Sequence, residues 1–309
     1  MCGESGLPAR NLGLVSQSPA TSSRRPAAPD PGGPLGSFLL PEGFARPRVL
    51  DVLRESTVVV EAGRHAVTSL DERRRLWRAS YAGSAASQST DPVILVPGFM
   101  AGDVSLHAMS RTLRRRGFRT YRSQIHVNVG CTVDAAAELE SRIESIAIKR
   151  EQRVRIVGHS LGGLLARGLA VRRPDLISGI VTMGSPMLAP AAHHLALTAS
   201  IEVLVRLSRA GVPGLMSEDC VAGHCARESF EESREPMPAG VSFTAIHSRR
   251  DGIVDWRACI DPEAYAVEVT SSHLGMAIDP RVVDVVTSAL RLPASGMGSV
   301  LEVDSGESA

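Results

Sequence analysis

Residues 154–170 read VRIVGHSLGGLLARGLA and combine three local signals in one stretch. A β-branched apolar run predicts a buried strand, and the leucine and alanine stripe after it predicts a helix. Between them, Gly158, Ser160 and Gly162 match the pattern G-x-S-x-G, in which a strained turn lifts a serine hydroxyl above the end of a strand. The glycines permit this turn because they let the helix pack close against the strand. Ser160 is therefore a candidate nucleophile.

Strands and helices alternate on both sides of this stretch. Short apolar runs predict further strands, and apolar residues at helical spacing predict the helices between them. We expect strands at Val93–Val96, Phe118–Ile125, Val154–Val157, Ile177–Met183, Val241–His247 and Tyr265–Thr270, and helices at Ser105–Arg115, Thr132–Lys149 and Pro280–Leu292. This alternation predicts an α/β fold with a mostly parallel sheet and helices on both faces.

Composition divides the chain into four parts. Residues 1–45 are rich in Pro, Gly, Ser and Ala and are expected to form a disordered tail, as are residues 293–309. Residues 46–90 predict an N-terminal helical segment, and residues 91–292 carry the α/β domain. The alternation stops at about 187–240, where an apolar helical insertion leaves the same sheet edge as Ser160. We interpret it as a lid or cap, although packing in the core also explains its apolar face.

A serine hydroxyl is a weak nucleophile at neutral pH, so it requires a general base and an acid that orients the base. Two further loops past predicted strands supply them: Asp251 follows the strand that begins at Val241, and His273 follows the one that begins at Tyr265. His273 is preferred over the other histidines because it lies at a strand end and in the correct chain order. Asp251 is followed by a glycine that permits a turn, and Asp255 in the same loop is the alternative acid.

Acyl transfer also requires donors to the developing oxyanion. The backbone N–H after the nucleophile and one from the loop after the first central strand usually serve, and here these belong to Leu161 and Phe99. Met100 and Met276, close to these loops in the sequence, are expected to line an apolar acyl site, with core packing as the alternative.

Three cysteines flank the insertion and the loop after Asp251. The spacing of Cys220 and Cys225, with His224 between them, is compatible with zinc, but a fourth ligand is not evident and no metal site is predicted. A disulfide between one of these cysteines and Cys259 is the second possibility, and reduced structural thiols are the third.

Charge and hydropathy restrict the class of protein. The formal net charge is +1, which argues against nucleic acid as the main partner. No run of 18 or more apolar residues predicts a transmembrane helix, and the N-terminal residues lack the apolar core of a signal peptide. A cytoplasmic location is expected on these grounds.

Several segments resemble those of bacterial α/β-hydrolase lipases and esterases: VILVPGFMAGD, VGHSLGGLLAR, MGSPM, HSRRDGIVDW and SSHLGM. The resemblance covers roughly Pro92 to Leu292 and implies the α/β-hydrolase fold. It also implies hydrolysis of a small-molecule or lipid carboxyl ester through an acyl-serine intermediate, without a metal or organic cofactor. One departure is Pro97, because many lipases have histidine before the glycine of the oxyanion loop.

The triad and the fold leave the substrate open. Acyltransferase, thioesterase and phospholipid deacylase activities use the same machinery, and a noncatalytic binding protein is the alternative outside enzymes. If the insertion is a lid, its apolar helix also predicts transient contact with a membrane or micelle.

Overall fold

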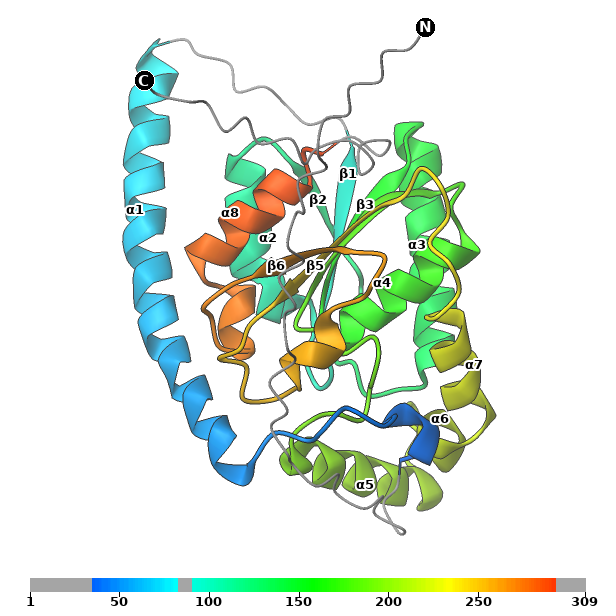
Figure 1. The fold of residues 1–309 in the computed structure, drawn as a ribbon. Helices are drawn as coiled ribbons and strands as arrows, with labels where there is room; N and C mark the ends of the chain where they lie inside the picture. The colour runs from blue at the N-terminus through cyan, green and yellow to red at the C-terminus, as the bar shows by residue number, and fades with distance from the viewer. Residues whose placement is uncertain (1–34, 83–90, 293–309) are drawn as a thin grey trace, which may run out of the picture.

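A parallel sheet forms the centre of the molecule. The computed structural model describes residues 35–82 and 91–292 (Figure 1). Within them, six strands pair in the order β2-β1-β3-β4-β5-β6, and every neighbouring pair is parallel. The strands are β1 (Pro92–Val96), β2 (Arg119–Arg122), β3 (Val154–His159), β4 (Ile177–Met183), β5 (Ser242–His247) and β6 (Tyr265–Glu268). The predicted α/β fold with a parallel sheet is confirmed.

Helices cover both faces of this sheet, as Figure 1 shows. On one face α3 (Thr132–Arg150) and α4 (Leu161–Arg172) pack on strand residues such as Ile94 and Ile156. On the other face α2 (His107–Arg115) and α8 (Pro280–Ala289) pack on Val93 and Val157. Successive strand residues therefore point to opposite cores, which explains why the central strands are mostly apolar on both faces.

The strand β2 is shorter than the Phe118–Ile125 run predicted for it. Both carboxylate oxygens of Asp103 accept hydrogen bonds in the following turn, from the backbone N–H groups of Ser123 and Gln124 at 3.0 Å each. Gln124 has a φ of 73°, a left-handed conformation that a strand does not use. The side chain of Asp103 thus stabilises a turn where apolar pattern alone predicted further strand.

The long helix α1 (Val58–Ala82) lies along the outside of the α2 and α8 layer and contacts α8 (Figure 1). Two short 3-10 helices precede it in the chain: η1 (Ser37–Leu39), which lies beside the insertion, and η2 (Val49–Thr57). Residues 1–34 and 293–309, most of the two expected tails, lie outside the described residues. Residues 35–45 are described, and the buried side chain of Leu39 packs against Ala191 and Ala226 of the insertion. Residues 35–45 therefore pack on the folded part of the protein, where composition predicted a disordered tail.

The insertion between β4 and β5 lies at the carboxyl ends of the strands. It contains α5 (Leu195–Arg209), α6 (Glu218–Ala222) and α7 (His224–Glu232), and α7 contacts both α3 and α4. Buried apolar residues such as Ile201 and Met216 form a small core of their own. This arrangement places three helices over the sheet edge that carries Ser160.

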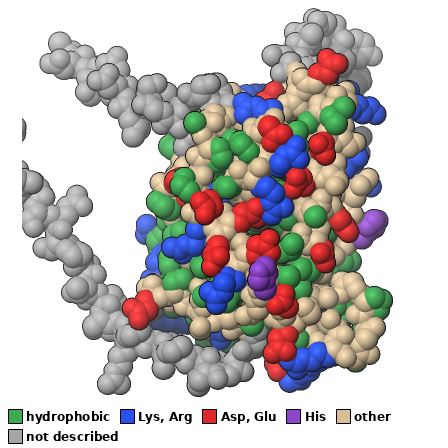
Figure 2. All heavy atoms as spheres, turned by 90° about the vertical axis from the view of Figure 1, so that its right-hand side faces the viewer, with side chains coloured by type: hydrophobic (Ala, Val, Ile, Leu, Met, Phe, Trp, Pro, Cys, Tyr) green, Lys and Arg blue, Asp and Glu red, His purple; other side chains and the backbone are tan. Residues whose placement is uncertain are grey.

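The surface over α3 and α7 mixes acidic and basic side chains, as Figure 2 shows. Arg172 pairs with Glu140 and Glu232, and Arg173 pairs with Glu140 and Asp175. Opposite charges therefore alternate on this face instead of forming a patch of one sign. Among the described helices, none has the length and apolar composition that a membrane crossing requires.

Candidate active site

Ser160 occupies a strained turn between β3 and α4. Its φ is 52° and its ψ is −121°, values that residues other than glycine rarely adopt, and its N–H donates to the carbonyl of Met183 at 2.9 Å. A Cβ on Gly158 would lie 2.5 Å from the carbonyl oxygen of Gly162, and one on Gly162 would lie 2.2 Å from that of Val96. Only glycine fits at both positions, so strand, turn and helix start pack closely enough to hold the serine above the sheet edge.

Asp251 and His273 form a buried pair at the same edge. Asp251 follows β5 and His273 follows β6, and the Nδ1 atom of the histidine lies 2.7 Å from Oδ2 of the aspartate. The other carboxylate oxygen accepts from the backbone N–H groups of Ile253 and Val254 at 2.8 Å each. The carboxylate is thus held in one orientation, and its partner histidine presents the opposite ring nitrogen away from it.

Electrostatics favour charge on this histidine. Burial lowers the pKa of His273, but the charge of Asp251, the hydrogen bond to it and the charge of Glu55 together raise the pKa above its ordinary value of 6.5. The neighbouring His159 differs, because burial and the proximity of His273 lower its pKa to about 4. Its Nε2 lies 3.0 Å from the carbonyl oxygen of His273, so the neutral ring of His159 supports the loop that carries the other histidine.

Asn128 holds the loop after β1. Its side-chain amide donates to the carbonyl of Pro97 at 3.0 Å, and its backbone carbonyl accepts from the N–H of Met100 at 2.9 Å. The backbone N–H of Asn128 donates in turn to Ala101 at 2.8 Å. These three hydrogen bonds support the loop in which Phe99 lies. Asn128 is buried, and no sequence pattern predicted it as part of the site.

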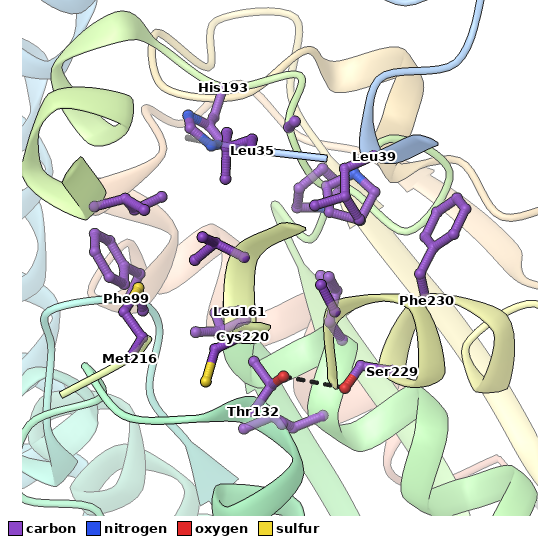
Figure 3. A pocket seen from close by; sticks show the side chains of 18 of the residues that line it. Leu35, Leu39, Phe99, Thr132, Leu161, His193, Met216, Cys220, Ser229 and Phe230 are labelled. Atoms are coloured by element: carbon purple, nitrogen blue, oxygen red, sulfur yellow. Dashed lines mark hydrogen bonds between the residues drawn. The ribbon is translucent and has the colours of Figure 1, made fainter. Parts of the chain in front are cut away.

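An apolar pocket of about 160 Å³ opens beside Ser160. Phe99 and Leu161 line it next to the serine, and Figure 3 shows residues of the insertion, including His193, Met216 and Phe230, on the other walls. At its base Thr132 of α3 and Ser229 of α7 share a hydrogen bond of 3.0 Å between their hydroxyls. His193 lines another wall of the pocket. Burial lowers the pKa of His193 to about 4, so its ring is uncharged at neutral pH.

Comparison with known proteins agrees with this architecture. Residues 91–219 match the family model of the alpha/beta hydrolase fold. The chain has the α/β-hydrolase fold. A triacylglycerol lipase of Vibrio cholerae is 29% identical over 104 residues, which span 32% of this chain and 33% of that protein. The match thus covers about a third of the length of the curated relative.

Solved structures share the fold at low sequence identity. The mature form of the Bacillus licheniformis lipase BlEst2 superposes with a TM-score of 0.54 at 13% identity, over 68% of this chain and 95% of that one. The propeptide form of the same lipase gives a TM-score of 0.53 at 13% identity, over 67% and 52% of the two chains. At such identity these likenesses establish the architecture of the α/β-hydrolase, and nothing about its substrate.

The side chains selected from the sequence of this α/β-hydrolase fall into two sets at the same edge of the sheet. Ser160, Phe99 and Leu161 line one pocket, and Asp251 contacts His273. The alternative acid, Asp255, is engaged elsewhere: it caps the 3-10 helix η4 (Trp256–Cys259) and pairs with Arg257 at 2.8 Å. Asp255 therefore has a structural task in the same loop.

The expected roles of Met100 and Met276 need correction, because neither lines this pocket. Met276 is fully buried in the core beneath α8, where it packs with Val282 and Val283. Met100 has a left-handed φ of 57° and a side chain that is 55% exposed. Proximity in sequence to the oxyanion loop and to His273 suggested an acyl site, but the backbone turns both side chains away from it.

Two acidic residues of the N-terminal segment hold the loops of the α/β-hydrolase site. Glu55 accepts hydrogen bonds from the backbone N–H groups of Gly252 and His273 at 3.0 Å each and from Leu274 at 2.9 Å. Glu61 accepts from the N–H of Ser272 at 2.8 Å and from the hydroxyls of Ser271 and Ser272 at 3.0 and 2.7 Å.

The carboxylates of Glu55 and Glu61 are both buried. Glu55 connects the loop of Asp251 with the loop of His273, because it accepts hydrogen bonds from both. Neither residue was predicted from the sequence, because their partners lie about two hundred positions away in the chain. In the local sequence, Glu55 and Glu61 are simply acidic residues among apolar ones in η2 and α1. Such a pattern is too common to indicate a buried carboxylate.

Proposed function

We propose that the protein is a carboxyl-ester hydrolase that uses Ser160 as nucleophile, His273 as general base and Asp251 as orienting acid. The observation that carries this proposal is the position of Ser160: a strained serine lines an apolar pocket at the sheet edge where the Asp251–His273 pair is buried. The match to a lipase over part of the chain supports the same reaction class.

In this mechanism the Ser160 oxygen attacks the ester carbonyl carbon while His273 accepts the hydroxyl proton at Nε2. The resulting imidazolium is stabilised by Asp251, in keeping with the raised pKa of His273. Collapse of the tetrahedral intermediate breaks the bond to the alcohol, which takes the proton and leaves an acyl-serine. Water, deprotonated by His273, then attacks the acyl carbon, and the carboxylic acid and free Ser160 are released.

The backbone N–H groups of Phe99 and Leu161 are the proposed donors to the oxyanion. Leu161 is the first residue of α4, so its N–H belongs to the positive end of a helix and has no partner inside it. Phe99 lies in the loop that Asn128 holds in place. Donors fixed before the reaction stabilise the developing charge without reorganisation.

The walls of the pocket favour an apolar acyl group as the substrate. Leu39, Leu197, Ile201 and Met216 offer contacts to hydrocarbon, and such contacts contribute roughly 0.8 kcal/mol for each buried methylene. Acyltransferase, thioesterase and phospholipid deacylase reactions share the acyl-serine step, and they differ in the acceptor or leaving group.

The outer face of α5 suggests how a lipid substrate reaches this pocket. Leu195, Val203 and Leu207 are exposed on α5, while Ile201 of the same helix is buried. An amphipathic helix with an exposed apolar stripe binds to the surface of a micelle or bilayer. We therefore propose that α5 makes transient contact with the surface of a lipid substrate.

A labelling experiment tests the nucleophile. Purified protein is treated with a fluorophosphonate probe, the modified peptide is identified by mass spectrometry, and hydrolysis of p-nitrophenyl esters is measured. We expect labelling at Ser160 and loss of activity by about 10³-fold or more in Ser160→Ala. Ser141→Ala on the exposed side of α3 is the matched control and should retain activity. Full activity in Ser160→Ala, or a folded protein that neither labels nor hydrolyses esters, would overturn the proposal in favour of a binding protein.

A second measurement distinguishes esterase from lipase. The p-nitrophenyl ester series from short to long acyl chains is assayed below and above the critical micelle concentration. A jump in rate above that concentration is expected if α5 binds the lipid surface, and it should be reduced in Val203→Ser. A rate that follows only the monomer concentration contradicts the contact with micelles.

A further inference from the structure

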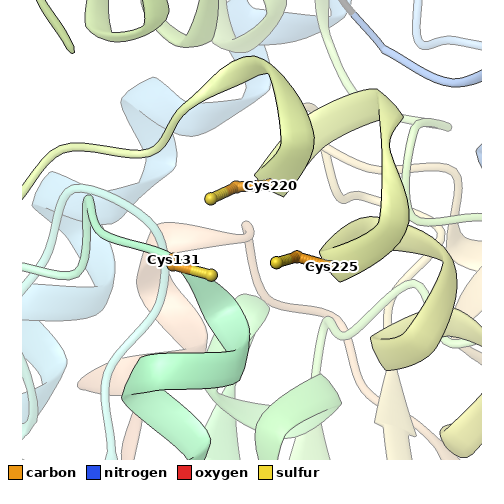
Figure 4. A group of neighbouring side chains, drawn as sticks. All are labelled: Cys131, Cys220 and Cys225. Carbon is orange, nitrogen blue, oxygen red and sulfur yellow. The ribbon is translucent and has the colours of Figure 1, made fainter.

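Three cysteines from separate elements meet at the rim of the pocket. Cys131 is the residue before α3, Cys220 lies in α6 and Cys225 lies in the first turn of α7. Their Sγ atoms all lie within 4.8 Å of one another, and all three are free, half-buried thiols (Figure 4). Figure 4 shows the three side chains pointing toward a common centre.

This separation matches the needs of a thiolate metal site. Zinc binds sulfur at about 2.3 Å, and tetrahedral geometry then places the sulfur atoms about 3.8 Å apart. A small adjustment of the side chains brings three sulfur atoms at no more than 4.8 Å to that spacing. A disulfide would use two of the thiols and leave the third unpaired beside it, so a shared ion accounts for the convergence of all three.

A further oxygen ligand is close to the cluster. The carboxylate of Asp219 accepts hydrogen bonds from the backbone N–H groups of His224 and Cys225 at 2.7 and 3.3 Å, and it contacts the Cys225 thiol. The side chain is exposed, and each carboxylate oxygen keeps a lone pair that these hydrogen bonds do not use, so Asp219 is available to a cation where it stands. His224 is a poorer choice, because its side chain is 84% exposed and faces Glu228 at 3.6 Å.

We propose that Cys131, Cys220 and Cys225 form a structural site for zinc, with Asp219 or a water molecule as the fourth ligand. Each thiol releases one proton on binding, so the site gains three thiolates and the protons pass to the solvent. This ligand set differs from the one considered from the sequence, which combined Cys220 and Cys225 with His224. Cys131 takes the place of the histidine, and only the fold brings it close to the other two cysteines.

The site would fasten the insertion to the sheet domain. Cys131 precedes a helix that packs on the sheet, whereas Cys220 and Cys225 belong to the helices over the pocket, and Cys220 itself lines the pocket. The hydroxyl pair of Thr132 and Ser229 forms a second link between α3 and α7 nearby. A bound ion therefore limits how far α6 and α7 move from the carboxyl ends of the strands, whatever reaction takes place there.

The experiment is an anaerobic titration of the full chain with Co²⁺, a spectroscopic substitute for zinc, after reduction and removal of metal. We expect thiolate-to-cobalt charge-transfer absorption that saturates at one ion per chain and is abolished by competing zinc. Zinc should also raise the Tm. Neither readout depends on ester hydrolysis, so failure of this proposal and failure of the proposed function are distinguishable.

Single variants locate the ligands. Cys131→Ser, Cys220→Ser and Cys225→Ser should each weaken cobalt binding by at least about tenfold. Cys259→Ser removes a buried thiol outside the cluster and should bind as the parent protein does. Asp219→Asn should weaken binding less than the cysteine variants. Circular dichroism verifies that each variant is folded.

Three results would overturn the proposal. These are the absence of charge-transfer absorption in folded, reduced protein, an equal loss of binding in Cys259→Ser, and a disulfide between two of the three cysteines in protein that binds no metal. Wild-type protein alone decides the first and third results, so a variant that does not fold leaves the test intact.

Discussion

Glu55 accepts a hydrogen bond from the backbone N–H of His273 at 3.0 Å, although 218 residues separate them in the chain. The same carboxylate accepts from Gly252 and Leu274, so it connects the loop of the proposed acid with the loop of the proposed base. The N-terminal segment, which lies outside the part of the chain that matches the family model, thus contributes directly to the geometry of the site.

Glu55→Gln is expected to change both activity and its pH dependence. The charge of Glu55 contributes to the raised pKa of His273, so its removal should shift the acid limb of the kcat/KM profile to lower pH. The amide also loses one acceptor oxygen, and an unsatisfied buried N–H costs about 1–3 kcal/mol of stability. The pH profile and urea unfolding measure the two effects.

Glu138→Gln, an exposed change on α3, is the control for this variant and should leave profile and stability unchanged. A Glu55→Gln variant of lower stability whose acid limb stays in place would assign Glu55 a purely structural role.

Asn128→Ala is expected to lower kcat by about tenfold with little change in KM. The side-chain amide donates a hydrogen bond to the carbonyl of Pro97, and such a bond contributes about 1 kcal/mol of stability. Its removal should loosen the loop that presents the N–H of Phe99 to the transition state. Steady-state kinetics with a p-nitrophenyl ester measure the effect, and Gln152→Ala before β3 is the control. A change confined to KM would show that the loop binds substrate without stabilising the oxyanion.

The pH dependence of activity follows from the raised pKa of His273. A general base acts in its neutral form, so kcat/KM should rise with pH through a midpoint above the ordinary value of 6.5. Activity is therefore lost on the acidic side, and it is retained toward alkaline pH until other groups titrate. A midpoint below 6.5 in rate measurements from pH 5 to 9 would contradict the pairing with Asp251.

Stability should fall on acidification because of two buried neutral histidines. The pKa values of His159 and His193 are lowered from 6.5 to about 4, first of all by burial. Below pH 6.5 the unfolded chain binds these protons and the folded one does not, so the free energy of unfolding decreases until about pH 4, by up to about 3 kcal/mol for each histidine.

His193→Phe should flatten this dependence in urea unfolding between pH 7 and 4. His107→Gln on the exposed face of α2 is the matched control. Parallel curves for the parent and His193→Phe would mean that His193 does not contribute.

Leu197→Trp should shift substrate preference toward shorter acyl chains. Leu197 of α5 lines the pocket, and a larger side chain there occupies space that the acyl group needs. We expect kcat/KM for long-chain p-nitrophenyl esters to fall by about tenfold, and that for short-chain esters to change little. Ala210→Trp at the exposed C-terminal end of the same helix is the control. An unchanged preference would place the acyl chain elsewhere.

Much of the architecture was predictable from local pattern. Apolar runs and helical periodicity identified the strands, and their alternation with helices predicted the parallel sheet. The turn at Ser160 was evident because glycines two positions away on each side permit its backbone conformation. Asp251 was preferred over Asp255 from the sequence, and in the structure Asp251 contacts His273 whereas Asp255 pairs with Arg257.

Other features depend on residues that are remote in the chain. The contacts of Glu55 and Glu61 with the loops of the site, the meeting of Cys131 with Cys220 and Cys225, and the burial of Met276 in the core have no local signature. Strands, helices and the serine turn follow from steric and periodic preferences of neighbouring residues, so VRIVGHSLGGLLARGLA by itself predicted β3, the turn at Ser160 and α4. The partners of a buried carboxylate or thiol follow from how the elements pack, and the tertiary structure alone decides which distant groups meet.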